Sequence, residues 1–371
     1  MSVNADETTL LGVDLGNSLA KVVYFEPEKL GENCHLSASN SSSKAIRDYI
    51  TSKTTYDEVD GVREESLTIP GVPLNDLTGS LHFIRFPVIE LDTVIGLMKT
   101  KGLPAKGITI TATGMGSYVN RKDFEEMEVD YRTADEFTTQ ASGLVYLLQH
   151  SPKECYYFEN PSNEELCRKV HVEKDHLTYP YLLVTVGSAT SICLVTSPKD
   201  FTVIGGSSIG GAMFLGLCCL VTPAKNFDEA MALAKRGNHK GTVDKVIGEV
   251  GSEYLQLRSG YKLPPDFVLV SFGHMLDPEQ RKAAKPEDLA RSLLATITTV
   301  VGAAVGDSVR ATGVKQVLFV GSFFGNNDLA KKQITAMQHF VSQGAVNSFF
   351  IEHEGYCSAV GALVEHDKVK A

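Results

Sequence analysis

Residues Gly12–Phe25, GVDLGNSLAKVVYF, form the stretch that decides the fold. An apolar run reaches Asp14, a short polar turn follows at Gly16–Ser18, and an alternating β-branched and aromatic stretch runs over Leu19–Phe25. Alternation with period two on either side of a Gly-Asn-Ser turn predicts a strand–turn–strand hairpin. Because a turn of small residues lets the backbone approach phosphate closely, the hairpin is a candidate phosphate-binding element.

A second hairpin of the same kind is predicted in the other half of the chain. Apolar strands at Tyr181–Val186 and Ser191–Val195 flank the small residues Gly187–Thr190. The Gly-rich loop Gly205–Gly211 then opens an apolar helix at Ala212–Val221. A glycine loop before a helix is the sequence form of an anion site, although a crossover loop packed through its glycines has the same composition. Two such hairpins suit a nucleoside triphosphate held between two lobes.

The bulk composition excludes several classes of function. The chain has 371 residues, 35 Lys plus Arg and 45 Asp plus Glu, for a net charge of −10, which is a poor basis for binding nucleic acid or an anionic membrane. The N-terminal residues Met1–Thr9 are polar and acidic, unlike a signal peptide, and the apolar stretch at Ala212–Val221 is too short to span a bilayer. Seven scattered cysteines without a CxxC pair indicate reduced thiols. We therefore expect a cytoplasmic α/β protein that binds neither nucleic acid nor membrane.

Three charged side chains near these elements are candidates for phosphoryl-transfer chemistry. Asp14, at the end of a predicted strand, can orient a magnesium-bound water, and Lys21 can neutralise developing charge. Glu136 is the candidate general base, but Thr133 three residues earlier also fits the N-cap of a capping box. Taken singly, a tight turn explains Asp14 and a capping box explains Glu136. The pair of hairpins, and a later strand ending at Gly321 near the expected adenosine, favour the functional interpretation.

The chain resembles animal-type (type II) pantothenate kinases from about Leu10 to about Val364. The resemblance is carried by an ordered series of short strings: Val13–Phe25, Leu81–Pro87, Ala112–Gly114, Asp135–Glu136, Glu154–Phe158, Gly210–Gly211 with Phe214–Cys218, Glu287–Arg291, Val317–Gly321, and Glu352–Tyr356 with Ala359–Leu363.

This resemblance implies a fold and an organisation of the chain. The fold is the acetate kinase/sugar kinase/Hsp70/actin-type two-lobed α/β fold with duplicated mixed sheets. We place the N-terminal lobe at 8–152, a connection at 153–180, and the C-terminal lobe at 181–366, with the second hairpin, the nucleotide loop and a dimer helix. The family forms homodimers and is inhibited by acyl-coenzyme A, so a homodimer, or a heterodimer with a related kinase, is expected.

The resemblance also implies an activity: ATP-dependent phosphorylation of pantothenate to 4'-phosphopantothenate, the first step of coenzyme A biosynthesis. ATP and Mg²⁺ are then the expected cofactors, with Asp14 holding the metal through water and Glu136 acting as the base. Motif by motif, the nucleotide is expected at Gly16, Asn17, Ser18, Lys21, Gly210, Gly211 and Gly321. The substrate is expected at Ser188, Thr190 and Ser191.

Several positions depart from the family pattern where phosphate is expected. Met115 and Met213 replace smaller residues, Ala189 replaces a glycine, and an arginine of the family falls at Val203. Added bulk, a Cβ at a position of positive φ, or a lost cation would each weaken catalysis. A catalytically inactive paralogue that binds nucleotide or acyl-coenzyme A as a regulator or partner subunit is therefore the second hypothesis, and a sugar kinase of the same superfamily is the third. The retained Asp14, Lys21 and Glu136 place the kinase first.

Overall fold

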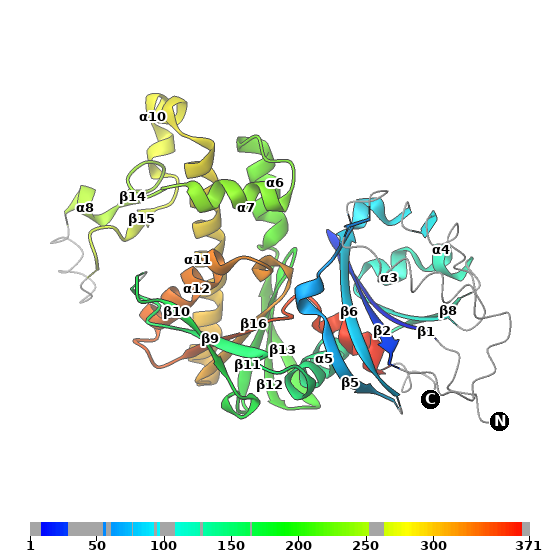
Figure 1. The fold of residues 1–371 in the computed structure, drawn as a ribbon. Helices are drawn as coiled ribbons and strands as arrows, with labels where there is room; N and C mark the ends of the chain where they lie inside the picture. Colours follow the sequence, from blue (N-terminus) through cyan, green and yellow to red (C-terminus); the bar gives the residue numbers. More distant parts are fainter. Residues whose placement is uncertain are drawn as a thin grey trace, which may run out of the picture.

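Two mixed β-sheets, one in each half of the chain, form the centres of two lobes (Figure 1). The computed structural model describes residues 9–28, 55–56, 61–75, 77–92, 95–96, 108–126, 129–163, 165–251 and 263–365.

The strands of the first sheet lie in the order β3 (Thr55–Tyr56), β4 (Gly61–Arg63), β6 (Leu77–Pro87), β2 (Leu19–Pro27), β1 (Thr9–Leu15), β7 (Ile108–Thr113) and β8 (Asp130–Thr133), and β5 (Ile69–Leu74) also pairs with β6. The strands of the second sheet lie in the order β10 (Arg168–Val172), β9 (Cys155–Glu159), β17 (Asn347–Ile351), β16 (Gln316–Val320), β11 (Tyr181–Val186), β12 (Thr190–Ser197) and β13 (Asp200–Ser207).

The two sheets repeat one topology. In the first, β6, β2 and β1 form an antiparallel meander in space, and β1 continues parallel to β7 and β8. In the second, β13, β12 and β11 are antiparallel, and β11 continues parallel to β16 and β17. The predicted hairpins, β1–β2 and β11–β12, therefore occupy equivalent positions. This duplication confirms the predicted two-lobed fold with duplicated mixed sheets.

One helix from each repeat lies between the lobes. Helix α5 (Glu136–His150) follows β8, and α13 (Cys357–Val364), drawn in red in Figure 1, follows β17. The two helices cross at glycines: a Cβ on Gly143 would lie 1.9 Å from the Cys357 carbonyl oxygen, and one on Gly361 would lie 1.6 Å from that of Thr139. Such close backbone contact requires residues without side chains. The crossing therefore locks the end of one repeat against the end of the other.

A single apolar cluster joins the two lobes. It contains Phe83 from the first sheet, Leu183 and Leu318 from the second, and Leu144 and Leu363 from the two crossing helices. Because burial of apolar surface is the main favourable term in folding, this shared cluster holds the two hairpins at one relative position.

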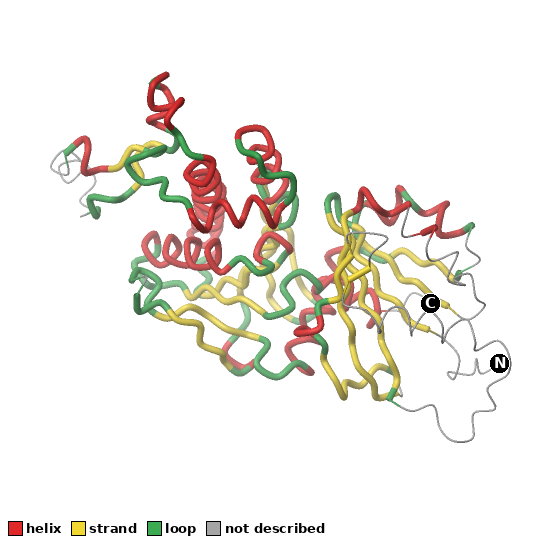
Figure 2. Tube along the Cα trace, turned by 45° about the horizontal axis from the view of Figure 1, so that its top comes forward, coloured by secondary structure: helices red, strands yellow, loops and turns green. Residues whose placement is uncertain are grey.

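The other helices of the C-terminal lobe lie along one side of its sheet (Figure 2). They are α6 (Gly211–Val221), α7 (Phe227–Arg236), α11 (Pro286–Thr312) and α12 (Asp328–Val341). A second apolar cluster, with Phe214, Met231, Ile297 and Ile334 from these helices, packs them on strand residues such as Phe319. The short elements of the lobe's outer extension are β14 (Lys245–Val246), α8 (Ile247–Val250), β15 (Val268–Val270), η5 (Gly273–Leu276) and α10 (Pro278–Ala283).

Within the described part of the chain, α11 is the one helix whose length and hydropathy would allow it to cross a membrane. Its most apolar window has a mean hydropathy of 1.5, and 56% of that window is buried inside the protein. Ile297, Val301 and Val305 of α11 belong to the core of the C-terminal lobe. Packing in that core accounts for its apolar face.

The predicted lobe boundaries at 152 and 180 stay predictions. Inside the predicted connection the structure places two strands, β9 and β10, and β9 pairs with β17 of the second sheet. The Gly-rich segment at 205–211 also differs from the prediction of a loop, because β13 continues to Ser207 and leaves only residues 208–210 between strand and helix.

Candidate active site between the lobes

The first hairpin carries a buried ion pair. Asp14 and Lys21 are partners in the register of β1 and β2, and Lys21 Nζ donates a hydrogen bond of 2.9 Å to Asp14 Oδ2. Both residues are more than nine-tenths buried. The Gly16 N–H donates to the Leu19 carbonyl at 3.1 Å and closes the turn beyond the pair. The hairpin therefore presents a charged pair directly below a tight turn.

The tips of the two hairpins meet. The Ser18 and Ser188 hydroxyl oxygens lie 3.0 Å apart, although 170 positions separate the two residues in the chain. The small-residue turns of both lobes thus lie side by side at the opening between the lobes. This is the arrangement expected of two turns that hold one triphosphate.

The segment before α6 packs on the second hairpin. The Gly211 N–H donates to the Gly187 carbonyl at 2.7 Å, and the Ala212 N–H to the Ser188 carbonyl at 3.2 Å. A Cβ on Gly210 would lie 2.8 Å from the same Ser188 oxygen, so close approach of the two backbones requires glycine there. The N–H groups of Gly211 and Ala212, which the predicted anion site would use, therefore already make hydrogen bonds within the protein. Phosphate contact at Gly210 and Gly211 stays a prediction.

Two glycines of positive φ border the hairpins. Gly114 follows β7 with φ of +81°, and a Cβ there would lie 2.8 Å from Asp14 Oδ1. Gly321 follows β16 with φ of +107°, and a Cβ there would lie 2.3 Å from the Val186 carbonyl at the end of β11. Both positions combine a left-handed backbone with lack of space, so only glycine fits.

Glu136 is the first residue of α5, and it does not cap the helix. The N-cap is Asp135, whose carboxylate accepts from the Thr138 N–H at 2.8 Å. The prediction that Thr133 and Glu136 form a capping box is therefore wrong: β8 continues through Thr133, and the helix begins later. The carboxyl group of Glu136 is therefore left without a capping role.

The electrostatic surroundings of Glu136 link it to the first hairpin. Desolvation of the carboxyl raises the pKa of Glu136, the negative charge of Asp14 raises it further, and Lys21 opposes both. The residue as a whole is exposed, so solvent still reaches the carboxyl group. A carboxylate with a raised pKa beside the candidate phosphate-binding turn is suited to accept a proton.

The three predicted substrate residues have different surroundings. Ser188 lies at the hairpin tip beside Ser18. Thr190 is buried, and its hydroxyl donates to the Ile209 carbonyl at 2.7 Å, which ties the hairpin to the glycine segment. Ser191 pairs across the ladder with Thr185, whose hydroxyl donates to Gln140 of α5 at 2.9 Å. Of the three, Ser188 has the position best suited to a ligand in the cleft, and the substrate roles stay predictions.

The residues that depart from the family pattern are all exposed. Met115, Val203 and Met213 are 66%, 49% and 42% exposed. Ala189 is not among the described residues with positive φ, so the backbone strain expected from its Cβ does not arise. The bulk expected at Met115 and Met213 and the cation lost at Val203 stay predictions.

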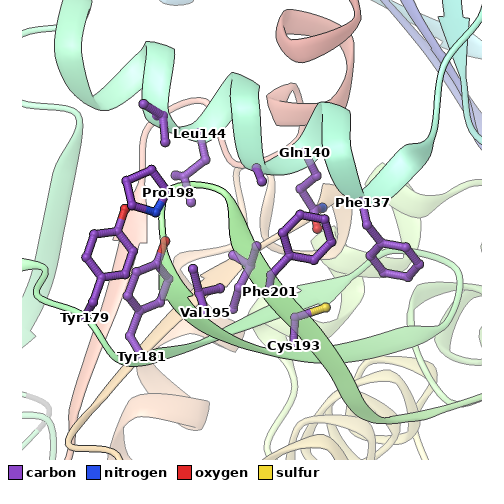
Figure 3. A pocket seen from close by; sticks show the side chains of 12 residues that line it. Phe137, Gln140, Leu144, Tyr179, Tyr181, Cys193, Val195, Pro198 and Phe201 are labelled. Carbon is purple, nitrogen blue, oxygen red and sulfur yellow. The ribbon is translucent and has the colours of Figure 1, made fainter. Parts of the chain in front are cut away.

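A large cleft of about 1690 Å³ lies between the lobes and contains both hairpin tips. Its lining includes Ser18, Lys21, Ser188, Gly211 and Ser322. A second, small pocket lies between α5 and strands β11 and β12, with Phe137, Tyr181 and Phe201 around it (Figure 3). That pocket has room for about 10 Å³, which is the space of one water molecule, so the interlobe cleft is the candidate site.

A buried charge network at the cleft wall is missing from the sequence-based prediction. Lys331 Nζ donates to the Tyr156 hydroxyl at 2.8 Å and to Glu354 Oε1 at 2.9 Å. Burial raises the pKa of Glu354 to about 7, although Lys331 opposes the shift. The sequence contains no signal for this network, because Glu354 belongs to a segment that reads as an ordinary turn and Lys331 to an amphipathic helix.

A second buried pair of the same turn connects the lobes. His353 Nδ1 lies 2.7 Å from Glu154 Oε2, and His353 Nε2 lies 2.7 Å from the Leu67 carbonyl of the N-terminal lobe. Burial alone would lower the pKa of His353, but the Glu154 carboxylate and the carbonyl outweigh it, so this pKa is raised. The imidazole thus bridges the two lobes at the wall of the cleft, which both His353 and Leu67 line.

The duplicated sheets, with paired hairpins meeting at an interlobe cleft, define a protein of the acetate kinase/sugar kinase/Hsp70/actin class. The chain belongs to the Fumble family, whose model matches residues 10–365.

Curated relatives agree with the resemblance drawn from the motifs. Pantothenate kinase of Schizosaccharomyces pombe is 30% identical over 374 residues, covering 98% of this chain and 83% of the relative. Pantothenate kinase 1 of Arabidopsis thaliana is 28% identical over 362 residues, covering 96% and 85%. The 4'-phosphopantetheine phosphatase of Mus musculus is 29% identical over 364 residues, and the match covers 98% of this chain but 41% of that protein. Among solved structures, the glucokinase of Balamuthia mandrillaris in complex with glucose aligns with a TM-score of 0.45 at 12% identity, covering 97% of this chain and 94% of the glucokinase.

Proposed function

We propose that this protein is a pantothenate kinase, which transfers the γ-phosphoryl group of ATP to pantothenate and yields 4'-phosphopantothenate for coenzyme A biosynthesis. Membership of the Fumble family and relatives named pantothenate kinase support the proposal. The observation that carries it is the meeting of the Ser18 and Ser188 turns above the Asp14–Lys21 pair, with the Glu136 carboxylate in the same electrostatic environment.

Positioning and charge stabilisation account for catalysis by such a site, because phosphoryl transfer requires little covalent chemistry from the protein. The hairpin turns at residues 16–18 and 187–189 hold the phosphate chain between the lobes. Lys21 stabilises negative charge near the transferred group. Glu136 accepts the proton of the pantothenate hydroxyl as the new P–O bond forms.

The residues present fit a magnesium ion that arrives with the nucleotide. Lys21 occupies Asp14 Oδ2, while the missing Cβ of Gly114 keeps space beside Asp14 Oδ1. Among the described residues no cluster of three His, Cys, Asp or Glu side chains converges. A single carboxylate suits Mg²⁺, which commonly keeps waters and is shared with substrate phosphates. When bound, the ion neutralises phosphate charge.

The surroundings of the site support three further proposals. Free cysteines, several of them buried, such as Cys155, Cys193 and Cys218, are consistent with work in the reducing cytoplasm. Exposed apolar residues on neighbouring elements of the C-terminal lobe support a homodimer, or a heterodimer with a related kinase: Val203 and Ile204 of β13, Met213 of α6 and Val300 of α11. The volume of the cleft is compatible with an acyl-coenzyme A as a regulatory ligand.

An activity assay tests the proposed function. Purified protein receives ATP, Mg²⁺ and pantothenate, and 4'-phosphopantothenate is measured for the wild type and for Glu136→Gln. We expect the variant to lose about 10²-fold or more in kcat, because the amide cannot accept a proton. Binding of ATP should be retained. Glu279→Gln, an exposed substitution on α10, is the matched control.

The pH profile gives a second readout. Turnover should fall as the pH decreases through the pKa of Glu136, because the protonated carboxyl is no longer a base. Since that pKa is raised above the ordinary 4.5, the acid limb should lie above pH 4.5. A wild type that binds ATP but forms no phosphopantothenate would contradict the proposal and favour the inactive paralogue.

A further inference from the structure

Arg85 of β6 extends the charged row of the first hairpin. Asp14 pairs with Lys21 across β1 and β2, and Lys21 pairs with Arg85 across β2 and β6. Residues directly opposite in a sheet project to the same face. Lys21 and Arg85 both line the interlobe cleft. The N-terminal lobe therefore presents two neighbouring cations beside the turn at residues 16–18.

Arg85 faces acidic partners from both lobes. Its Nε lies 3.5 Å from Glu64 Oε1, and its guanidinium lies 3.8 Å from Asp228 Oδ2. Asp228 stands in the first turn of α7, in the C-terminal lobe, so the second pair crosses between the lobes. The Asp228 side chain is 79% exposed. An ion pair that long and that exposed is weak and exchanges readily for a stronger partner.

Glu64 is held in place independently of Arg85. The Tyr356 hydroxyl, from the turn before α13, donates to the other carboxylate oxygen of Glu64. Glu64 can therefore orient the guanidinium group while Asp228 leaves. The two partners have different roles, one fixed and one replaceable.

We infer that Arg85 contacts the phosphate groups of the nucleotide and that Asp228 occupies its guanidinium while the cleft holds no nucleotide. The inference rests on the proposed function only in taking the nucleotide to be ATP. A planar guanidinium can form two hydrogen bonds to phosphate oxygens at once. The exposed Asp228 carboxylate, 3.8 Å away, offers a weaker interaction. Arg85 thereby supplies a fixed cation to a site in which Val203 stands where the family has an arginine.

Binding of the magnesium complex of the non-hydrolysable analogue AMPPNP, measured by calorimetry, tests this assignment. We expect Arg85→Gln to weaken binding about tenfold or more, since charge-assisted hydrogen bonds to phosphate are lost. Arg85→Lys should retain part of the affinity, because it keeps the charge without the fork. Asp228→Asn should tighten binding a few-fold by removing the competing carboxylate. Binding of adenosine, which lacks phosphate, should be unchanged in all three.

The opposite signs of the two substitutions distinguish a ligand contact from a structural tie. Arg121→Gln is the control, because that arginine is paired with Glu125 on the surface helix α4 (Arg121–Glu125), and we expect no change in binding. Equal weakening by Arg85→Gln and Asp228→Asn would overturn the inference and leave a pair that merely joins the lobes. The inference would also be overturned if Arg85→Gln left AMPPNP binding unchanged but raised the KM for pantothenate. That result would assign Arg85 to the carboxylate of pantothenate. A wild type that binds AMPPNP but does not phosphorylate pantothenate overturns the proposed function alone.

Discussion

At the scale of single residues, Gly114 shows how one backbone conformation shapes the site. Its φ of +81° turns the chain away at the end of β7, and its hydrogen in place of a side chain leaves room beside Asp14 Oδ1. Any other residue at position 114 would place its Cβ 2.8 Å from Asp14 Oδ1, against the buried Asp14–Lys21 pair. The proposed magnesium site at Asp14 therefore depends on a residue whose own side chain takes no part in binding.

Replacement of Gly114 by alanine should lower both stability and activity. We expect a loss of roughly 1–3 kcal/mol in the free energy of unfolding, from strain at positive φ and from collision with Leu15 and Asp14. Urea unfolding and the pantothenate assay measure the two effects. Gly313→Ala is the matched control, because Gly313 has φ of +72° but nothing within 4 Å of its Cβ position. Equal effects of the two substitutions would show that strain alone matters and that the space beside Asp14 does not.

At the scale of elements, the crossing of α5 and α13 sets the distance between the two repeats. Gly143 and Gly361 bring the helix backbones into direct contact, and a Cβ on Gly12 of β1 would lie 2.1 Å from the Ala359 carbonyl of α13. Glu136 starts one of these helices, so its position relative to Asp14 follows from how closely they pack. The placement of the proposed base relative to Asp14 is thus a property of the helix pair.

Gly143→Ala should separate the crossing helices. We expect destabilisation of about 3 kcal/mol or more, because neither backbone can yield by the distance that a methyl group needs. Chemical denaturation measures this loss. The control is Gly216→Ala, in α6, where nothing lies within 4 Å. That substitution should stabilise the protein by about 0.5–1 kcal/mol, since alanine favours a helix over glycine. A mild effect at Gly143 would contradict the close crossing.

At the scale of the whole molecule, the two lobes share one apolar core around a cleft. The apolar cluster with Phe83, Leu144 and Leu318 spans both lobes, and the His353–Leu67 hydrogen bond joins them at the cleft wall. Closure of the cleft on a nucleotide would then involve the weak pairs at its mouth, such as Arg85 with Asp228, while the shared core keeps its packing.

The two lobes should therefore unfold in a single transition. The chain has no tryptophan, so one can be introduced into each lobe as a separate fluorescent probe. We expect Tyr131→Trp in the first lobe and Phe340→Trp in the second to report the same urea midpoint, as a two-state system requires. Circular dichroism of each variant controls for altered secondary structure. Two well-separated midpoints would contradict a core shared between the lobes.

Local pattern accounts for much of what the sequence predicted correctly. The hairpin at Gly12–Phe25, its counterpart after Tyr181, and the helix at Ala212–Val221 follow from period-two alternation, turn residues and an apolar run. The α5 start was placed too early, because Thr133 has the composition of an N-cap but is used to extend β8. The strain expected at Ala189 does not arise, because its φ depends on the neighbouring segments.

The sequence by itself determined the two hairpins, the candidates Asp14, Lys21 and Glu136, and the family, because turn chemistry and strand periodicity act between residues close in the chain. Only the tertiary structure decided that Ser18 meets Ser188, that Arg85 faces Asp228, and that Glu354 is buried beside Lys331. The physical reason is that the crossing helices and the shared apolar core determine these contacts. Burial of apolar surface brings distant segments together without regard to their separation along the chain.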